Sequence, residues 1–275
     1  MRPLGSSGPW SAGPVTPRAT ALLAPNPSWM TLDGTNSWLL AEPGATQAIL
    51  VDPGPEDPSH LDALVAAAES IGARISLVLL THGHADHSAG ARSLHERTGA
   101  PVRALDPHHR LGAEGVVDGD VVVVAGLELS VVATPGHTTD SLTFLLGADR
   151  ALLTGDTVLG RGSAVIAHPD GHLGDYLASL DRLSELAGAT DSAWVLPGHG
   201  PACPDPMTLL ADYQEHRRAR LAMVAQAMAS GITELDPLLE HVYPEVVPEL
   251  RWAARLSLAA QVEYLTDRAR GLTAH

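Results

Sequence analysis

Short apolar runs separated by turn residues dominate the first two thirds of the chain. Runs of strand length, bounded by residues such as Gly, Pro and Asp, lie at 37–40, 47–52, 75–80, 121–124, 127–132, 141–146, 151–153 and 192–196. Between them, the segments 58–70 and 174–186 carry apolar residues at three-to-four spacing, which is typical of helices that cover a sheet, and 88–97 is expected to be a further helix. This order of elements predicts an α/β fold with two sheets between layers of helices.

Residues at the ends of two of these segments are typical of helix termini. Asp57 is placed as the N-cap of the first helix, with Pro58 at its first position and Gly72 beyond its end. For the second helix we expect Ser88 as the N-cap and Gly99 as the closing residue.

Proline residues divide the chain near position 204. Beyond Pro201, Pro204 and Pro206 the pattern is helical throughout, at about 207–229, 234–242 and 248–269. The first 20 residues are rich in Gly, Pro, Ser and Ala and are expected to be a loose tail. The predicted organisation is therefore a tail over 1–20, a main domain over 21–204 and a helical C-terminal region over 205–275.

Composition and charge narrow the class of protein. The chain has 275 residues, 45% of them hydrophobic, which allows a large core. Its 17 basic residues are all arginine, and 32 acidic residues give a net charge of −15, which repels nucleic-acid backbones. The single cysteine, Cys203, cannot form an internal disulfide. No segment has the apolar run of a membrane span or a secretory signal, so a cytoplasmic location is expected.

The segment that follows the run at 75–80 holds the candidate chemistry. His82, His84, Asp86 and His87 lie within six residues, and Gly83 suits a tight loop in which their side chains converge. Their spacing is not that of two helical histidines four residues apart. The sequence predicts a metal site on this loop.

Three later residues repeat the same setting of apolar run, turn and ligand-type side chain. They are His137 in Thr-Pro-Gly-His, Asp156 in Leu-Thr-Gly-Asp and His199 in Leu-Pro-Gly-His. With this set the sequence resembles the metallo-β-lactamase superfamily over nearly its whole length. Segments 26–27, 31–36 and 213–218 sharpen the resemblance toward the branch that contains β-lactamase-like protein 2.

The resemblance implies an αββα sandwich and a winged-helix-like C-terminal region, although the chain leaves little room for the wing after 269. It further implies that His82, His84 and His137 hold one ion, that Asp86, His87 and His199 hold a second, and that Asp156 bridges them. Imidazole and carboxylate ligands are compatible with two divalent ions, zinc above all, with manganese or iron as alternatives. The reaction implied is hydrolysis by a hydroxide shared between two ions.

Two carboxylates are candidates for catalytic roles beside the ligands. Asp86 is expected to orient the hydroxide. Asp52 either accepts a hydrogen bond from a ligand histidine or caps its own Asp-Pro-Gly turn, and the sequence favours neither. His168 and His172 lie in a loop that either borders the substrate pocket or is an ordinary connection.

Three functions remain open from the sequence. The first is hydrolysis of a small acyl ester or thioester, which the acidic composition favours. The second is a single-strand endoribonuclease, which the resemblance to the β-lactamase-like protein 2 branch supports, with Arg217, Arg218 and Arg220 as the candidate RNA-binding cluster. The third is a mononuclear iron enzyme of the sulfur-dioxygenase type. We expect a small-molecule substrate and neither nucleic acid nor membrane as partner; the sequence predicts no oligomeric state.

Overall fold

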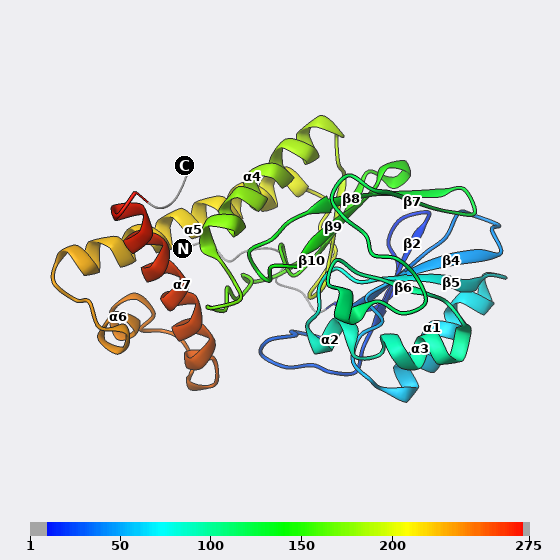
Figure 1. Ribbon diagram of the computed structural model, residues 1–275, viewed down its shortest axis with the longest axis horizontal. Helices are drawn as coiled ribbons and strands as arrows, with labels where there is room; N and C mark the ends of the chain where they lie inside the picture. Colours follow the sequence, from blue (N-terminus) through cyan, green and yellow to red (C-terminus); the bar gives the residue numbers. More distant parts are fainter. Residues whose placement is uncertain (1–9, 272–275) are drawn as a thin grey trace.

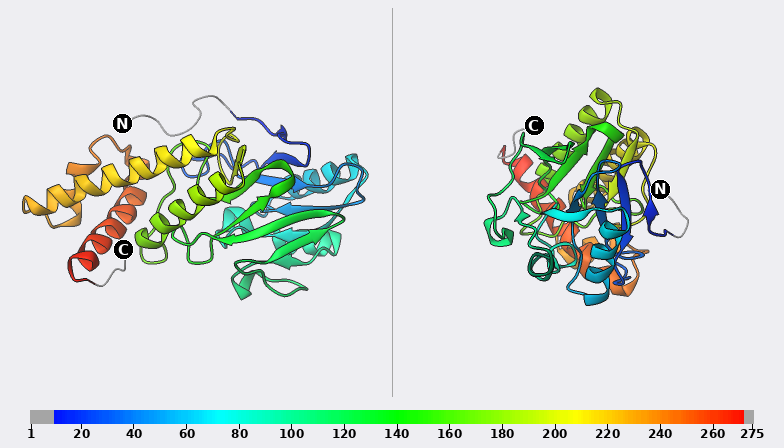
Figure 2. Two further views of the ribbon diagram at one scale, coloured as in Figure 1. Left: turned by 90° about the horizontal axis from the view of Figure 1, so that it is seen from above. Right: turned by 90° about the vertical axis from the view of Figure 1, so that its right-hand side faces the viewer.

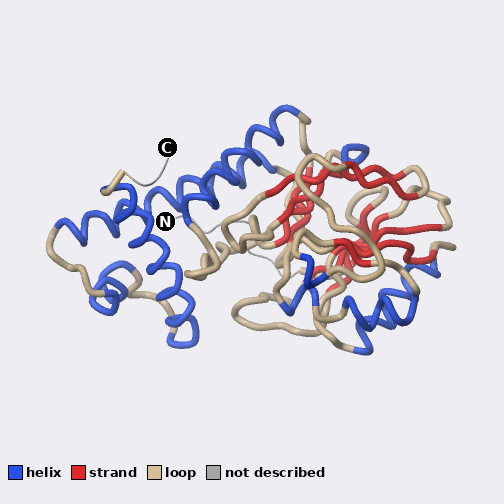
Figure 3. Tube along the Cα trace, in the orientation of Figure 1, coloured by secondary structure: helices blue, strands red, loops and turns tan. Residues whose placement is uncertain are grey.

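Two β-sheets packed face to face form the centre of the protein. The structure is a computed structural model that describes residues 10–271. Figure 1 shows the sheets in one half of the molecule and a projection of C-terminal helices in the other, and Figure 3 shows the strands gathered between helices. The predicted αββα architecture is confirmed.

The first sheet is built from the N-terminal part of the chain and contains six strands in sequence order. β4 and β5 are parallel, as are β5 and β6, while the other neighbours are antiparallel. The strands are β1 (Gly13–Pro14), β2 (Ala19–Leu23), β3 (Asn36–Leu40), β4 (Gln47–Val51), β5 (Arg74–Leu79) and β6 (Val102–Arg103).

The second sheet has the order β11-β10-β9-β8-β7, in which only β10 and β11 are parallel. Its strands are β7 (Val121–Val124), β8 (Leu127–Ala133), β9 (Leu142–Leu146), β10 (Ala151–Gly155) and β11 (Trp194–Pro197). β7 and β8, at the predicted apolar runs 121–124 and 127–132, form a hairpin.

Alternation along the strands creates three apolar layers. In β4, Ile49 and Val51 face the other sheet, where Phe144 of β9 packs, whereas Leu50 faces outward toward the helices. Successive side chains of a strand point to opposite faces, so a strand that is buried on both faces needs apolar residues at consecutive positions.

Helices cover both outer faces. α1 (Pro58–Ser70), α2 (Ala85–Ser88) and α3 (Ala91–Thr98) lie on the side of the first sheet, and α4 (Leu173–Ala189) and α5 (Pro206–Ala229) on the side of the second. The Asp57 carboxylate accepts a hydrogen bond from the His60 N–H at 2.9 Å, as predicted for the N-cap of α1. Gly99 ends α3 in a left-handed conformation, also as predicted.

The C-terminal region contains the second half of α5, α6 (Leu235–Val242) and α7 (Arg251–Ala269), with a 3-10 turn at Pro248–Leu250. Figure 2 shows these helices extending from one end of the sandwich. Among residues 206–271 the structure has no strand, so the described part of a winged-helix-like region lacks a wing. No helix in residues 10–271 is long and apolar enough to cross a membrane.

Helix α5 begins directly after the predicted boundary at 204/205 and packs against both the main domain and the other C-terminal helices. Leu209, Leu210 and Tyr213 pack with strands β9–β11 and α4, whereas Val224 and Ala227 pack with α6 and α7. The division at 204/205 stays a prediction, and this shared packing argues against two independent units.

Two local predictions differ from the structure. Ser88 ends α2 and does not cap α3; its hydroxyl donates to the Gly83 carbonyl at 2.9 Å, inside the metal loop. Residues 10–20 of the predicted loose tail are not loose, because β1 and β2 pair with each other and Ala19 is buried in the core. The Arg18 side chain also pairs with Asp149 at 2.7 Å. Residues 1–9 lie outside the described residues.

Candidate metal centre

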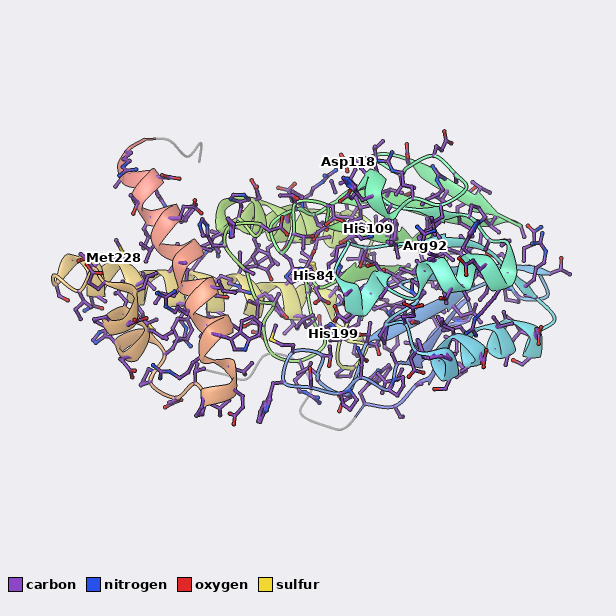
Figure 4. The ribbon with its side chains drawn as sticks, turned by 60° about the horizontal axis from the view of Figure 1, so that its bottom comes forward. His84, Arg92, His109, Asp118, His199 and Met228 are labelled. Carbon is purple, nitrogen blue, oxygen red and sulfur yellow. The ribbon has the colours of Figure 1, made fainter. Side chains whose placement is uncertain are left out.

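The seven predicted ligand residues come together at one end of the sandwich. The loop after β5 and the adjoining α2 provide His82, His84, Asp86 and His87, while the turns after β8, β10 and β11 provide His137, Asp156 and His199. Figure 4 shows His84 and His199 near each other, on the side of the sandwich that faces the C-terminal helices.

One group of ring nitrogens centres on His84. The Nδ1 atom of His84 lies 3.1 Å from Nε2 of His82 and 3.1 Å from Nε2 of His137. These three nitrogens are close enough to share one cation.

A second group lies beside it. Nε2 of His199 is 3.2 Å from Nε2 of His87 and 3.1 Å from an Asp86 carboxylate oxygen. Asp86, His87 and His199 therefore also have the spacing of a cation site.

Asp156 lies between the two groups. Its Oδ2 atom is 3.7 Å from Nε2 of His137 in the first group and 3.3 Å from Nε2 of His199 in the second. Its Oδ1 atom is 3.4 Å from Nε2 of His87 and has no hydrogen-bond partner in the described residues, although it is buried. A buried carboxylate oxygen without a partner is costly unless a cation binds it.

Acceptors behind the histidines fix which ring nitrogen carries the proton. Nδ1 of His137 donates to the Val165 carbonyl at 2.7 Å, and Nδ1 of His199 donates to the Gly34 carbonyl at 3.2 Å. Because a carbonyl oxygen only accepts, Nδ1 carries a proton in both rings, and in the neutral form of each ring Nε2 presents a lone pair to the centre. Such outer contacts are typical of metal-ligating histidines.

Asp52 is the acceptor behind two further rings, directly for His87 and through Thr81 for His82. Its carboxylate accepts from Nδ1 of His87 at 2.9 Å and from the Thr81 hydroxyl at 2.6 Å, and the Thr81 oxygen in turn accepts from Nδ1 of His82 at 3.0 Å. Of the two roles that the sequence left open for Asp52, the geometry is that of the histidine partner. Asp52 is held in the left-handed region, with φ of 54°, a conformation that Asp tolerates better than most residues.

The two Pro-Gly-His turns need their glycines for space. A Cβ atom at Gly198 would lie 2.5 Å from Asp156 Oδ1 and 2.6 Å from the His87 ring. At Gly136 it would lie 2.3 Å from the backbone of Tyr176 in α4. Glycine thus lets both turns bring His137 and His199 close to their neighbours.

The protonation state of each buried histidine depends on its burial and on the carboxylates next to it. Burial holds the pKa of His82 well below its ordinary value and lowers the pKa of His137 to about 4, so these rings are neutral. Burial also opposes charge on His199 and His87, but the charges and hydrogen bonds of the neighbouring carboxylates, Asp156 first among them, together outweigh it, and they raise the pKa of His199 to about 9 and that of His87 well above the usual value. The centre therefore requires positive charge next to Asp156, which divalent cations would provide in place of protons.

These contacts fit bound metal ions. A single proton on His84 Nδ1 can bond only one of the two Nε2 atoms 3.1 Å away well, the buried Asp156 Oδ1 has no partner among the described residues, and the donor set is imidazole and carboxylate. The described cluster is that of a divalent-metal site.

A cavity of about 300 Å³ opens onto the centre. Its walls include apolar side chains from outside the ligand set. The lining residues are Met30, Thr31, His84, Asp86, His137, Asp156, Val165, Ala167, His199 and Trp252.

The segment 164–168 forms one wall of the cavity and is bound to the C-terminal helices. The Ala164 carbonyl accepts from the Arg217 guanidinium of α5 at 2.5 Å, and the Ile166 N–H donates to the Ser257 hydroxyl of α7 at 3.2 Å. Between these two contacts the Val165 carbonyl accepts from His137. We call residues 164–168 the wall segment.

Sequence reasoning missed Met30, Val165 and Trp252, because an apolar side chain at a cavity has no motif of its own. Neither His168 nor His172 lines the cavity; His168 pairs with Glu263 at 2.9 Å. Because His168 is the last residue of the wall segment, their loop nevertheless borders the site through Val165 and Ala167.

The comparisons with known proteins agree with the fold and the site. The family model described as the metallo-beta-lactamase superfamily matches residues 30–199. Two mixed sheets between helices, with a His/Asp cluster at the strand ends, define this class. The chain belongs to the metallo-β-lactamase superfamily.

Within the superfamily, the chain is 32% identical over 259 residues to the beta-lactamase-like protein 2 homolog of Caenorhabditis elegans, covering 90% of this chain and 83% of the relative. It is 35% identical over 217 residues to the lactamase-like protein adaB of Aspergillus niger, covering 78% of this chain and 65% of the relative. It is 30% identical over 217 residues to an atrochrysone carboxyl ACP thioesterase of Aspergillus chevalieri, covering 78% and 67%.

A solved structure of a metallo-beta-lactamase family protein from Thermus thermophilus has the same fold. Its TM-score is 0.75 at 24% identity, and the match covers 92% of this chain and 94% of that one. The resemblance predicted from the sequence motifs is thus confirmed at the level of the superfamily and of the similarity to β-lactamase-like protein 2.

Proposed function

We propose that this protein is a hydrolase that holds two divalent metal ions, zinc in the first instance, and cleaves a small acyl ester or thioester. The observation that carries the proposal is the convergence of seven candidate ligand side chains in two groups, with Asp156 between them, five of which form the floor of a cavity. His82, His84 and His137 would hold one ion, and Asp86, His87 and His199 the other. The thioesterase name of one relative supports the substrate class.

Two bound divalent ions would lower the pKa of water and polarise the bond under attack. The chain's own residues provide the rest. Asp86 lines the cavity, and although burial opposes its charge, its bond to His199 holds its pKa below the usual value, so the carboxylate is ready to accept a hydrogen bond from the attacking water. Asp52 keeps the His87 ring oriented. In the overall reaction, water adds to the acyl carbon, the C–S or C–O bond breaks, and a carboxylic acid and a thiol or alcohol leave.

The similarity to β-lactamase-like protein 2 keeps a single-strand endoribonuclease as the second candidate. The arginine cluster of α5 argues against it. Arg217 is buried and bound to the Ala164 carbonyl, and Arg220 bonds the Val242 carbonyl at 2.6 Å and stacks on Tyr243. Arg218 alone of the three projects into solvent, and even it lies 3.8 Å from Asp181. One exposed arginine is a weak basis for phosphate binding.

Metal analysis and a paired activity assay test the proposal. The purified chain, reconstituted with zinc, should contain about two ions and should hydrolyse thioesters but not a labelled single-stranded RNA. A chain that never holds more than one ion and is active with iron alone would favour a mononuclear enzyme of the dioxygenase type. RNA cleavage without thioester hydrolysis would place the endoribonuclease first. The variant that tests RNA binding is Arg218→Glu, because Arg218 is exposed, whereas Arg217 is buried and Arg217→Glu would disturb the fold.

A further inference from the structure

The cavity has two chemically different parts. Its floor holds the side chains of His84, Asp86, His137, Asp156 and His199. Its walls are mainly apolar: Met30 comes from the loop after β2, Val165 and Ala167 come from the wall segment, and Trp252 comes from α7. In Figure 1 the loop after β2 extends toward the first turn of α7, so the two sides of the molecule meet at this cavity.

Trp252 is the most unusual of these residues. The residue is 55% exposed and lines the cavity, so a ligand bound there can remove aromatic surface from water. The first turn of α7 also carries Arg251, and Arg255 follows one turn later, but both are paired with acidic residues of α6; Nε of Arg255 is 2.9 Å from Asp236. Of these three side chains, only the indole lines the cavity.

Charge around the cavity excludes one class of substrate. None of its lining residues is an arginine, and the chain contains no lysine. The partly exposed Asp86 carboxylate faces the same space. An acyl group that ends in a carboxylate would therefore find no partner, whereas an apolar acyl group would remove the indole, Met30 and Val165 from water.

The apolar wall is also held in place before a ligand arrives. Ser257, on α7 between Trp252 and the end of the helix, accepts from Ile166, whose neighbours Val165 and Ala167 both line the cavity. One hydrogen bond thus joins the two apolar sides. A preformed wall costs less entropy when a ligand binds.

We propose that Trp252 is a specificity-determining residue that binds an uncharged, apolar acyl group of the substrate, together with Met30 and Val165. This rests on the proposed acyl hydrolase function. The C-terminal region then contributes directly to substrate selection, since Trp252 belongs to α7.

The experiment compares thioesters of N-acetylcysteamine that differ only in the acyl group: acetyl, hexanoyl, phenylacetyl and succinyl. The zinc-loaded chain should prefer hexanoyl and phenylacetyl over acetyl and succinyl. Trp252→Ala should lower kcat/KM for hexanoyl and phenylacetyl roughly tenfold, mainly through KM, and leave acetyl nearly unchanged, because only the longer groups reach the indole. Trp252→Phe should retain the preference, and Trp252→Arg should increase kcat/KM for succinyl.

Trp29→Ala is the matched control. Trp29 is 62% exposed and does not line the cavity, so its removal should leave all four kcat/KM values unchanged. An unchanged preference in Trp252→Ala, or an equal loss for all four thioesters, would overturn the inference and leave the acyl hydrolase standing. Hydrolysis of none of the four thioesters would instead overturn the proposed function, and the inference with it.

Discussion

Replacing Ser257 tests whether the C-terminal helices position a metal ligand. Ser257 is buried, and its hydroxyl accepts from the Ile166 N–H, one residue from the carbonyl that orients His137. Ser257→Val removes the hydroxyl that accepts the hydrogen bond. Ser257→Thr keeps this hydroxyl and adds a methyl group, so its side chain is branched like that of valine. Valine and threonine have nearly the same shape, so the two variants differ mainly in the hydroxyl that accepts the hydrogen bond.

The expected magnitude follows from the buried N–H group. Leaving it without an acceptor costs about 1–3 kcal/mol. In a chain of this size, 1 kcal/mol corresponds to ~2–4 °C in Tm. Loss of an outer contact to a metal-binding histidine typically weakens metal binding ~10–100-fold, and because Ser257 acts through Val165 we expect the lower end, about tenfold, in Ser257→Val.

Two measurements separate the structural effect from the positioning effect. Thermal unfolding of the metal-free variants gives the stability, and competition with a chelator gives the zinc affinity. We expect Ser257→Val to be less stable and to bind zinc more weakly than Ser257→Thr. Equal zinc affinity of the two variants would refute the idea that the wall segment transmits the contact to His137, even if their stabilities differ.

Three further predictions concern single residues. His84→Ala should abolish hydrolysis while circular dichroism stays native, because the ligand loop lies outside the sheet cores; global unfolding of the variant would show a structural role for the metals. Asp52→Asn should weaken zinc binding ~10–100-fold, since a neutral amide holds the His87 N–H less strongly, and unchanged zinc retention in chelator titrations would contradict this. Burial, and then the charge of Arg217, lowers the pKa of His216 to about 4 in the folded protein, so the unfolded chain binds a proton that the folded chain does not, and stability should fall as pH drops from about 6.5 toward 4. His216→Gln should reduce that fall in denaturant titrations at pH 7 and pH 5, and parallel curves for variant and wild type would exclude His216 as a source.

Most helices and strands could be predicted because the residues that indicate each of them lie within the same short segment of the sequence. The helix over Pro58–Ser70 has its cap, its proline and its apolar spacing in the sequence, and the structure has the same bounds. The seven candidate ligand residues were equally visible, since each lies in the loop, short helix or turn that follows an apolar strand, and the structure brings them into one cluster.

Features that depend on contacts between distant segments could not be predicted in this way. Ser88 has the residue type of an N-cap, but the loop uses its hydroxyl to bind Gly83. The strand Ala19–Leu23 is a strand because it pairs with β3, and its surrounding Gly, Pro and Ser residues indicated a tail. Arg217 belongs to a basic cluster in the sequence, yet its side chain points inward to a carbonyl 53 residues away.

The course of α5 limits how such an enzyme could exchange its C-terminal part during evolution. The Tyr213 hydroxyl accepts from the Leu159 N–H at 2.9 Å and donates to the Gly162 carbonyl at 2.8 Å, so the first half of α5 helps to build the loop behind the metal centre. A recombination point in the proline-rich stretch before the helix would separate that loop from its support. Exchange of the C-terminal part is compatible with an intact centre only where the crossover falls inside α5, after Tyr213 and Arg217.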